Sequence, residues 1–272
     1  MKKYLIFSDI DGTLLDCTRN LIEISDKTLY ALQEVKKVAY LVLVTGRPKC
    51  FITNRILSIN PDGFILTNGA YAELNNEVIY RNCFNKKDIE HIKSYCRKTN
   101  DPLLLCCQDY CYTLELGNRY CEDFVTSMSK DPKKIIRVND ELESCDFVWL
   151  KSMTEEGRVN IEKEFTDEYN INRQQETTFD CVKKSVSKDN AIKEFIKKCN
   201  FDYEKTICFG DGLNDVGMMK IVDYSFAMGN ARDYTKSCAK EVAKDVLDDG
   251  FYYALVEHDI IKPIKKYHKN KT

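Results

Sequence analysis

Short apolar runs alternate with helix-like stretches at the amino end of the chain. The predicted strands are Tyr4–Ser8, Tyr40–Val44 and Phe64–Leu66. Residues 25–38 carry apolar side chains at helical spacing, with Ser25 placed to cap the helix, and residues 47–59 could hold a second helix. Strands separated by helices favour a parallel sheet covered by helices, so the alternation predicts an α/β fold.

The middle of the chain has a different character, and the alternation then returns. Residues 71–80 are a predicted β-hairpin. Beyond it, the predicted elements are strands at 103–116 and 146–151 and helices at 86–98 and 155–169. The later elements are helices at 188–199, 214–221 and 231–239 and strands at 206–209 and 224–228. This order predicts a core, residues 1–83 and 186–272, interrupted by an inserted α+β domain, residues 84–185.

Composition and charge exclude several classes of protein. The 272 residues include 41 basic and 43 acidic side chains, a net charge of −2, which argues against a nucleic-acid binder that relies on a basic surface. No apolar run approaches the roughly 18–20 residues of a membrane span. The apolar start ends at Ser8-Asp9-Ile10-Asp11, too early for an export signal, so we expect a cytoplasmic protein.

The thirteen cysteines are scattered through the chain and contain no C-x-x-C pattern. The tightest group is Cys106, Cys107 and Cys111, and none of the three histidines lies in a ligand-like cluster with a cysteine. The spacing therefore does not support a structural zinc site. We expect reduced thiols that fill the core as small apolar side chains.

Polar residues beside glycine follow three of the predicted core strands. The segments are Asp9-Ile10-Asp11-Gly12-Thr13, Thr45-Gly46-Arg47 and Gly210-Asp211-Gly212-Leu213-Asn214-Asp215. Turn residues are common at strand ends, which would explain any one of these segments. The three together point to a ligand site, because open parallel sheets bind ligands at the carboxyl ends of their strands.

The acidic side chains of these segments predict phosphoryl chemistry. Extended backbone places Asp9 and Asp11 on one side, which suits a nucleophile paired with a general acid or base. Asp211 and Asp215 add two more carboxylates, and so acidic a pocket needs a cation. Oxygen ligands without histidine or cysteine favour Mg²⁺. With Lys188 and backbone N–H groups, the metal could bind a phosphate dianion.

These segments, in this order, resemble the four motifs of the haloacid dehalogenase superfamily. The motifs are Asp9-Ile10-Asp11-Gly12-Thr13-Leu14-Leu15, Thr45-Gly46-Arg47, Lys188 and Gly210-Asp211-Gly212-Leu213-Asn214-Asp215. Asn68-Gly69-Ala70 and Ala227-Met228-Gly229-Asn230-Ala231 are further similar to the Cof-type phosphatases of that superfamily. The resemblance spans nearly the whole chain. It implies a Rossmann-like core with a mobile α/β cap, here residues 84–185.

The resemblance also implies a role for each motif residue. Asp9 would attack phosphorus and form an aspartyl-phosphate, and Asp11 would protonate the leaving oxygen and then activate water. Thr45 would hydrogen-bond the transferring phosphoryl group, and Lys188 would stabilise its charge. The implied metal ligands are Asp9, Asp11 through its backbone carbonyl, Asp211 and Asp215, the last either directly or through water. The implied phosphate or substrate contacts are Gly12, Gly46, Arg47 and Asn214, although Arg47 could equally pair with a neighbouring acid and Asn214 could instead orient Lys188.

The expected function is Mg²⁺-dependent hydrolysis of small phosphorylated metabolites, such as sugar phosphates or phosphorylated cofactors. The cap would exclude bulk water and select the substrate. One alternative is a phosphomutase, which would move a phosphoryl group between positions on one sugar. Another is a non-catalytic phosphate sensor that stores an aspartyl-phosphate, although Asp11 would have no clear purpose there. We expect neither nucleic acid nor membrane as a partner, and no oligomeric state is predicted.

Overall fold

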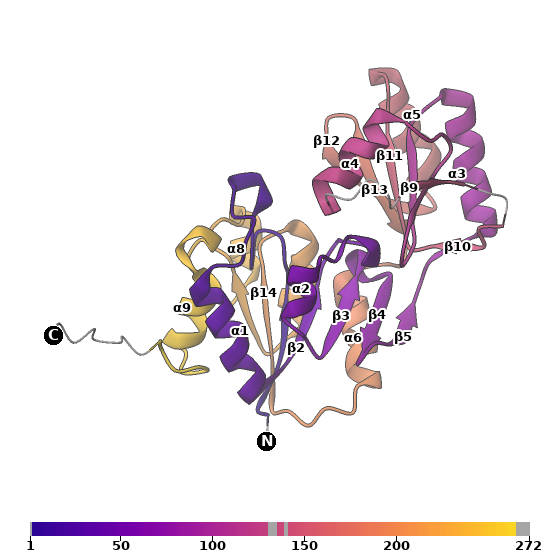
Figure 1. The fold of residues 1–272 in the computed structure, drawn as a ribbon. Coiled ribbons are helices and arrows are strands. Elements are labelled where there is room, and N and C mark those ends of the chain that lie inside the picture. The colour runs from indigo at the N-terminus through magenta and orange to yellow at the C-terminus, as the bar shows by residue number, and fades with distance from the viewer. Residues whose placement is uncertain (1, 130–134, 139–140, 265–272) are drawn as a thin grey trace. The chain divides into compact units, whose positions relative to one another are not determined.

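Two compact units make up the chain in the computed structural model, which describes residues 2–129, 135–138 and 141–264 (Figure 1). The first unit consists of Met1–Val44, Ile59–Phe64 and Cys199–Thr272. The second unit consists of Thr45–Ser58 and Ile65–Lys198. The inserted domain predicted for residues 84–185 falls within the second unit, and its boundaries stay a prediction.

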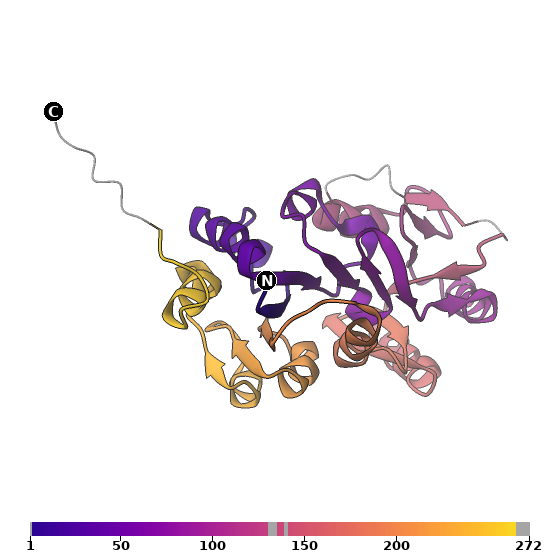
Figure 2. The same cartoon turned by 90° about the horizontal axis from the view of Figure 1, so that it is seen from below.

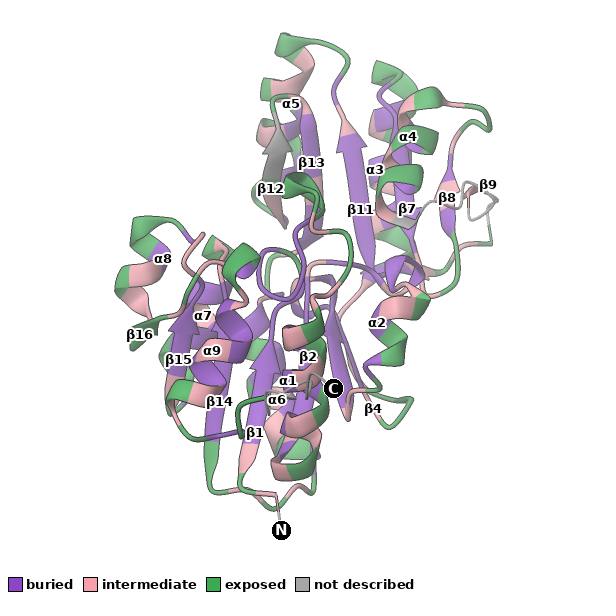
Figure 3. Ribbon diagram, turned by 60° about the vertical axis from the view of Figure 1, so that its left-hand side comes forward, coloured by how far each residue is buried: buried purple, intermediate pink, exposed green. Residues whose placement is uncertain are grey.

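A parallel sheet forms the centre of the first unit. Its strands are β1 (Tyr4–Ser8), β2 (Ala39–Val44), β14 (Lys205–Gly210), β15 (Tyr224–Ala227) and β16 (Glu241–Val242). They lie in the order β16-β15-β14-β1-β2, and each neighbouring pair is parallel. β1 is buried from Leu5 to Ser8 (Figure 3), which explains its continuous apolar run.

Helices and short 3-10 turns connect these strands. They are η1 (Cys17–Arg19), α1 (Asp26–Val38), η5 (Leu213–Asp215), α7 (Val216–Ile221), α8 (Asp233–Cys238), η6 (Val246–Asp248) and α9 (Gly250–Glu257). The Ser25 side chain caps α1 by accepting a hydrogen bond from the Thr28 N–H at 3.1 Å, as predicted. α9 packs beside α1 (Figures 1 and 2), and the Tyr30 and Tyr252 rings meet edge to face there, with centroids 6.3 Å apart.

A six-stranded, mostly antiparallel sheet forms the centre of the second unit. Its strands are β7 (Leu103–Cys106), β8 (Cys111–Thr113), β9 (Ile135–Arg137), β11 (Phe147–Lys151), β12 (Tyr169–Gln175) and β13 (Thr178–Lys183). Their order is β12-β13-β11-β7-β8-β9, and β8 and β9 are the parallel pair. β4 (Tyr71–Leu74) and β5 (Glu77–Arg81) form a hairpin, and β6 (Phe84–Asn85) pairs with β10 (Ser144–Cys145).

The remaining elements of the second unit are helices, 3-10 turns and the end of one strand. They are η2 (Lys49–Phe51), α2 (Asn54–Ser58), η3 (Thr67–Gly69), α3 (Lys86–Thr99), α4 (Arg119–Ser129), α5 (Glu155–Phe165) and α6 (Lys188–Lys198). β3 (Gly63–Leu66) begins in the first unit and ends in the second.

The six-stranded sheet is covered on both faces, and β7 shows why. Leu103 and Leu105 belong to one apolar core with side chains of α3 and α5. Leu104 and Cys106 belong to a second core with side chains of α4 and η2. Because side chains alternate along a strand, every position of β7 is buried and apolar (Figure 3).

Most predicted elements are confirmed. The strand at 4–8 has the predicted bounds, and the neighbouring strands and α1 differ by a residue. The predicted hairpin turns at Asn75 and Asn76, which both have positive φ, a conformation that asparagine tolerates better than most residues. The alternation of strands and helices therefore predicts the order of elements well.

Three predicted elements were too long. The helix predicted at 47–59 divides into η2 and α2, because Ile52 adopts an extended conformation between them. The strand predicted at 103–116 is the hairpin β7–β8, closed by a hydrogen bond from the Cys107 N–H to the Tyr110 carbonyl at 2.9 Å. The helix predicted at 155–169 ends at Phe165, and β12 begins at Tyr169.

Candidate active site

Asp9 directly follows β1, at the carboxyl end of the parallel sheet. Ser8 pairs with Phe209 of β14, and the Asp9 N–H donates a hydrogen bond to the Phe209 carbonyl at 2.9 Å. β1 and β14 therefore end level, and the segments that follow them lie side by side. The next strand along the chain, β2, lies on the opposite side of β1 from β14. Open α/β sheets bind ligands where the strand order changes direction in this way.

The loop after β14 folds around one carboxylate. Asp215 Oδ2 accepts hydrogen bonds from the N–H groups of Asp211 at 3.0 Å and Gly212 at 2.9 Å. A Cβ atom on Gly210 would lie 2.5 Å from Asp215 Cγ, which is closer than packed atoms allow. Glycine at this position therefore lets the Asp215 side chain turn back under its own loop.

The three carboxylates of Asp9, Asp211 and Asp215, the carboxylate cluster, each offer an oxygen within 4.8 Å of the others. Asp9 and Asp215 are buried, and Asp211 is half-buried. Negative charges so close together, with little water between them, repel one another, and a divalent cation removes the repulsion. A donor set of carboxylate oxygens fits Mg²⁺. Three of the predicted metal ligands thus lie together.

Gly12 allows Asp211 to approach the segment after β1. Gly12 has a φ of +85°, and its N–H donates to the Leu15 carbonyl at 2.7 Å, which closes a tight turn. A Cβ atom at this position would lie 2.3 Å from Asp211 Oδ2. The side chain of the preceding residue, Asp11, is exposed and does not join the carboxylate cluster. The predicted ligation by Asp11 does not require it to, because it uses the backbone carbonyl.

A second group of predicted site residues is assembled within the second unit. The Thr45 N–H donates to the Ile65 carbonyl at 2.9 Å, and the Asn68 N–H donates to the Thr45 carbonyl at 3.0 Å. The Arg47 N–H donates to Thr45 Oγ1 at 3.2 Å. A Cβ atom on Gly46 would lie 3.2 Å from Asn68 Oδ1. Thr45 and Arg47 are buried, so this segment is held firmly against the end of β3 and η3.

Lys188 belongs to the same group. It is the first residue of α6 and is almost fully buried. A Cβ atom on Gly69 would lie 2.3 Å from the carbonyl oxygen of the preceding residue, Ser187, so η3 packs directly on the start of α6. Asn68 and Gly69 therefore link the Thr45 segment to Lys188. Asn214 belongs to the first unit, where it is exposed in η5 beside Asp215.

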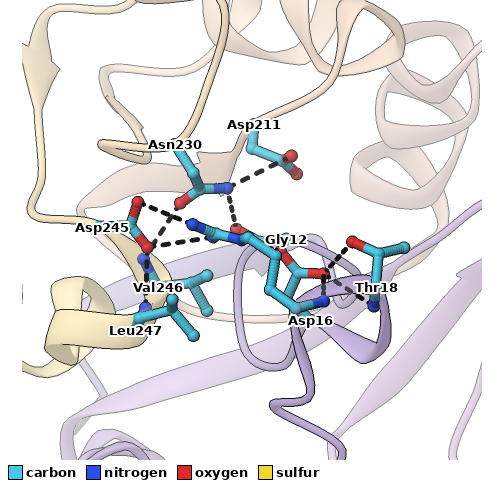
Figure 4. Close-up of polar contacts among 9 residues, drawn as sticks. Gly12, Asp16, Thr18, Asp211, Asn230, Asp245, Val246 and Leu247 are labelled. Carbon is cyan, nitrogen blue, oxygen red and sulfur yellow. Dashed lines mark hydrogen bonds and ion pairs between the residues drawn. The ribbon is translucent and has the colours of Figure 1, made fainter.

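Asn230 is the main residue of the site that has no predicted role. Its Nδ2 donates to the Gly12 carbonyl at 2.8 Å and lies 3.5 Å from Asp211 Oδ2, and its Oδ1 accepts from the Val246 N–H at 3.0 Å (Figure 4). One amide from the loop after β15 thus contacts the segments after β1, β14 and β16. The resemblance of residues 227–231 to a known family drew attention to this segment, but an amide contact across 218 residues has no local sequence signal.

Arg19 ties the segment after β1 to a distant loop. Its Nη1 and Nη2 donate to the Asp245 carboxylate at 3.1 and 3.0 Å, and its Nε donates to Asp16 Oδ2 at 2.7 Å (Figure 4). Burial would raise the pKa of both carboxyl groups. Hydrogen bonds from Thr18 and Arg19 to Asp16, and from Arg19 and the Leu247 N–H to Asp245, outweigh burial and lower both pKa values.

Comparison with known proteins adds a family to this geometry. A family model described as haloacid dehalogenase-like hydrolase matches residues 6–255. A Bacillus subtilis (strain 168) protein named "Putative phosphatase YkrA" is 28% identical over 264 residues, which cover 96% of this chain and 100% of that protein. The Bacillus subtilis 5-amino-6-(5-phospho-D-ribitylamino)uracil phosphatase YcsE is 27% identical over 258 residues, 92% of this chain and 94% of its own.

Solved structures also superpose closely on this chain. A hypothetical protein from Geobacillus kaustophilus HTA426 superposes with a TM-score of 0.83 at 25% identity, covering 95% of this chain and 100% of that one. The HAD subclass IIB sugar phosphatase BT4131 superposes with a TM-score of 0.77 at 26% identity, covering 96% and 100%. Within the described part of the chain, no helix combines the length and apolar character needed to cross a membrane. The chain belongs to the haloacid dehalogenase-like hydrolase family and is a phosphatase of that family.

Proposed function

We propose that this phosphatase hydrolyses the phosphate monoesters of small metabolites in a Mg²⁺-dependent reaction, with Asp9 as the nucleophile. The carboxylate cluster is the observation that carries this proposal. Asp9 directly follows the central strand, is held by a backbone hydrogen bond to β14, and lies beside two further carboxylates. A backbone fixed in this way limits the positions that the Asp9 carboxylate can take relative to a bound phosphoryl group, which favours attack.

The carboxylate cluster would hold the Mg²⁺ ion. Asp9, Asp211 and Asp215 offer hard oxygen ligands, and the Asp11 carbonyl is a proposed further ligand. When bound, Mg²⁺ neutralises charge on the carboxylates and on the phosphoryl oxygens. The hydrogen bonds that Asp215 accepts from its own loop fix the orientation of its carboxylate before the metal binds.

The remaining roles follow the order of the reaction. Asp9 attacks phosphorus and the bond to the leaving oxygen breaks, while Asp11 gives that oxygen a proton. Asp11 then takes a proton from the water that attacks the aspartyl-phosphate, which releases phosphate and restores Asp9. Thr45 and Lys188 bind the phosphoryl oxygens during both steps, with the backbone of Gly12 and Gly46 close to the phosphate.

The other proposed contacts are assigned to binding. Arg47 and Asn214 are proposed to contact the phosphate or the substrate. Residues 84–185 are proposed to act as a cap that excludes bulk water and contacts the leaving group. The proposed substrates are sugar phosphates or phosphorylated cofactors. Two similar proteins, named as a sugar phosphatase and as a phosphatase of a phosphoribitylamino-uracil, support this class of substrate.

Hydrolysis of p-nitrophenyl phosphate by the full chain tests the proposal. We expect Mg²⁺ to support release of phosphate and EDTA to abolish it, with activity restored by added Mg²⁺. Equal activity with and without EDTA would overturn the metal requirement. A screen of phosphorylated metabolites, read by free phosphate and by chromatography of the organic product, identifies the substrate. An isomerised sugar phosphate in place of free phosphate would favour the phosphomutase reaction.

A further inference from the structure

Three cysteines that are far apart in the sequence meet inside the second unit. Cys111 Sγ lies 3.2 Å from Cys106 Sγ and 3.6 Å from Cys50 Sγ. All three sulfur atoms lie within 4.8 Å of one another, and the side chains are at most 2% exposed. We call Cys50, Cys106 and Cys111 the thiol cluster. It shares no residue with the carboxylate cluster, so a role for the thiol cluster is independent of the proposed function.

The fold holds these thiols in place from two sides. Cys106 and Cys111 are directly opposite each other on β7 and β8, so their side chains leave the same face of the sheet. Cys50 lies in η2, which packs against α4 on that face. The sulfur atoms are thus brought together by strand register and by the packing of one short turn, without contribution from a flexible loop.

The surroundings of the thiol cluster are apolar. Its neighbours in the core include Phe51, Leu104, Val125 and Trp149. Burial raises the pKa of the Cys106 thiol well above its usual value, so this thiol stays protonated near neutral pH. All thirteen cysteines lie in the described ranges and none forms a disulfide. This arrangement favours a cation that binds sulfur strongly enough to displace the thiol protons.

The ligand number decides which cation fits. Within the described ranges, the cluster offers three ligands, all of them sulfur. The described histidines, His91 and His258, contact carboxylates of Glu164 and Glu241 elsewhere. Zn²⁺ in a closed site takes four ligands, and iron–sulfur clusters take four cysteines. Soft thiolate ligands also select Cu(I). Three sulfur atoms in a plane are enough to complete the coordination of this ion.

The spacing of the sulfur atoms suits an ion at their centre. An ion bound to sulfur at about 2.3 Å holds tetrahedrally arranged sulfur atoms about 3.8 Å apart, and trigonal ones about 4.0 Å apart. The two Sγ–Sγ separations, 3.2 and 3.6 Å, are shorter than those values, and small rotations of the cysteine side chains would lengthen them.

We propose that Cys50, Cys106 and Cys111 form a closed, three-sulfur binding site for Cu(I), or for another soft cation that accepts three-coordinate sulfur. Each ligating thiol releases its proton to solvent, and the oxidation state of copper does not change. Bound Cu(I) would link η2, which follows the Thr45-Gly46-Arg47 segment, to the β7–β8 hairpin. It would therefore stiffen the second unit beside a proposed phosphate-binding segment.

Titration of the reduced full chain with Cu(I) under nitrogen, in competition with a chromogenic Cu(I) chelator, tests the proposal. We expect one Cu(I) per chain to resist the chelator. Cys50→Ala and Cys111→Ala should weaken that binding at least about tenfold, as loss of a coordinating group does. Cys96→Ala and Cys181→Ala are matched controls, because these buried cysteines belong to the core on the other face of the sheet and should leave binding unchanged.

Two further measurements keep the test independent of folding and of catalysis. X-ray absorption of the copper-loaded chain should count three sulfur neighbours at about 2.3 Å. The Asp9→Asn variant should retain the same single Cu(I), whether or not it hydrolyses phosphate esters. Binding that is no weaker in Cys50→Ala than in Cys181→Ala, two sulfur neighbours, or a Cys106–Cys111 disulfide in the isolated chain would overturn the proposal. Zn²⁺ bound more tightly than Cu(I) would also overturn it.

Discussion

The carboxylate cluster and the thiol cluster are both groups of three potential metal ligands, yet they lie in opposite settings. The carboxylate cluster sits at the ends of two parallel strands, where Asp211 is half-buried and backbone N–H groups hold the Asp215 carboxylate. The thiol cluster lies in an apolar core between a sheet and a helix. Carboxylates are charged without a metal and repel one another, whereas protonated thiols pack as apolar side chains.

This difference has consequences for stability. Without a cation, the carboxylate cluster should destabilise the fold, because its charges are brought together in a partly buried site. The thiol cluster should stabilise the fold even without an ion, because it fills a core. Ligands for a hard cation thus reduce the stability of the unloaded chain, and ligands for a soft cation do not.

Asp9→Asn should give the largest effect. It removes the nucleophile, so hydrolysis of p-nitrophenyl phosphate should fall by about 10³-fold or more. Loss of one charge from the carboxylate cluster should leave the free energy of unfolding in EDTA equal or higher. Activity and urea unfolding measure the two effects. Asp233→Asn, an exposed position in α8, is the matched control and should change neither. Retained turnover in Asp9→Asn would refute its role as nucleophile.

Gly12→Ala should give the next largest effect. The residue needs a φ of +85°, which costs an alanine about 1–2 kcal/mol, and the new methyl group would meet Asp211 Oδ2. Displacement of that carboxylate by about 1 Å should lower activity by about 10²-fold. Steady-state kinetics over a range of Mg²⁺ concentrations measures the loss.

Gly117→Ala is the control for backbone strain alone. Gly117 also has a positive φ, of 79°, but a Cβ atom there would meet nothing within 4 Å. It should lose stability without losing activity. If the two variants lose activity equally, the close approach of Gly12 to Asp211 has no special importance.

Asn230→Ala should have a smaller effect, on metal binding. Asn230 is a positioning residue, because it holds the Gly12 carbonyl and approaches Asp211. Loss of such an outer contact costs metal sites about 10–100-fold in affinity, so the Mg²⁺ concentration for half-maximal rate should rise by about tenfold. The rate at saturating Mg²⁺ should fall much less. A lower rate at every Mg²⁺ concentration, with no shift of the midpoint, would assign Asn230 a merely structural role.

Arg19→Gln should give the smallest effect, and that effect should depend on pH. The pKa values of Asp16 and Asp245 are lowered in the folded chain, so their pairing with Arg19 adds stability above the unfolded pKa of 3.8. That stability is lost as pH falls through the folded pKa. For partly exposed pairs we expect about 0.5–1 kcal/mol at pH 6.

Urea unfolding of the wild type and of Arg19→Gln between pH 3 and pH 7 measures this difference. The two curves should begin to converge as pH falls below about 3.8 and should meet only below the lowered pKa values of the folded chain. Arg119→Gln removes a longer and more exposed ion pair and serves as the control, with little change at any pH. A difference that grows as pH falls would contradict the assignment.

Local sequence patterns predict most of the first unit. Tyr4–Phe7 is apolar because β1 is an inner strand whose side chains are buried from Leu5 onward, and Asp9 follows because the strand ends at Ser8. Glycines beside the acids signal the close approaches that the structure contains at Gly12 and Gly210. The order of the motifs along the chain then predicts that segments as distant as those of Asp9 and Asp211 belong to one site. No single local pattern could predict this.

Contacts made by tertiary packing alone escaped prediction. Cys50 meets Cys111 only because η2 packs on the β7–β8 hairpin, and a spacing of 61 residues carries no sign of it. Asn230 reaches Gly12 in the same way. The strand predicted at 103–116 runs past the end of β7 because Cys107 and Tyr110 are compatible with a strand. In the structure, the hydrogen bond between them closes a turn. Residues of ordinary propensity leave such choices to the surrounding fold.

The most direct test of the carboxylate cluster is to trap the phosphorylated residue. The chain is mixed with substrate and Mg²⁺, quenched in acid within milliseconds, digested and analysed by mass spectrometry. We predict one phosphoryl group on the peptide that contains Asp9, absent when EDTA replaces Mg²⁺ and absent in Asp9→Asn. Rapid turnover with a phosphoryl group on another residue, or with the same adduct in Asp9→Asn, would contradict the account.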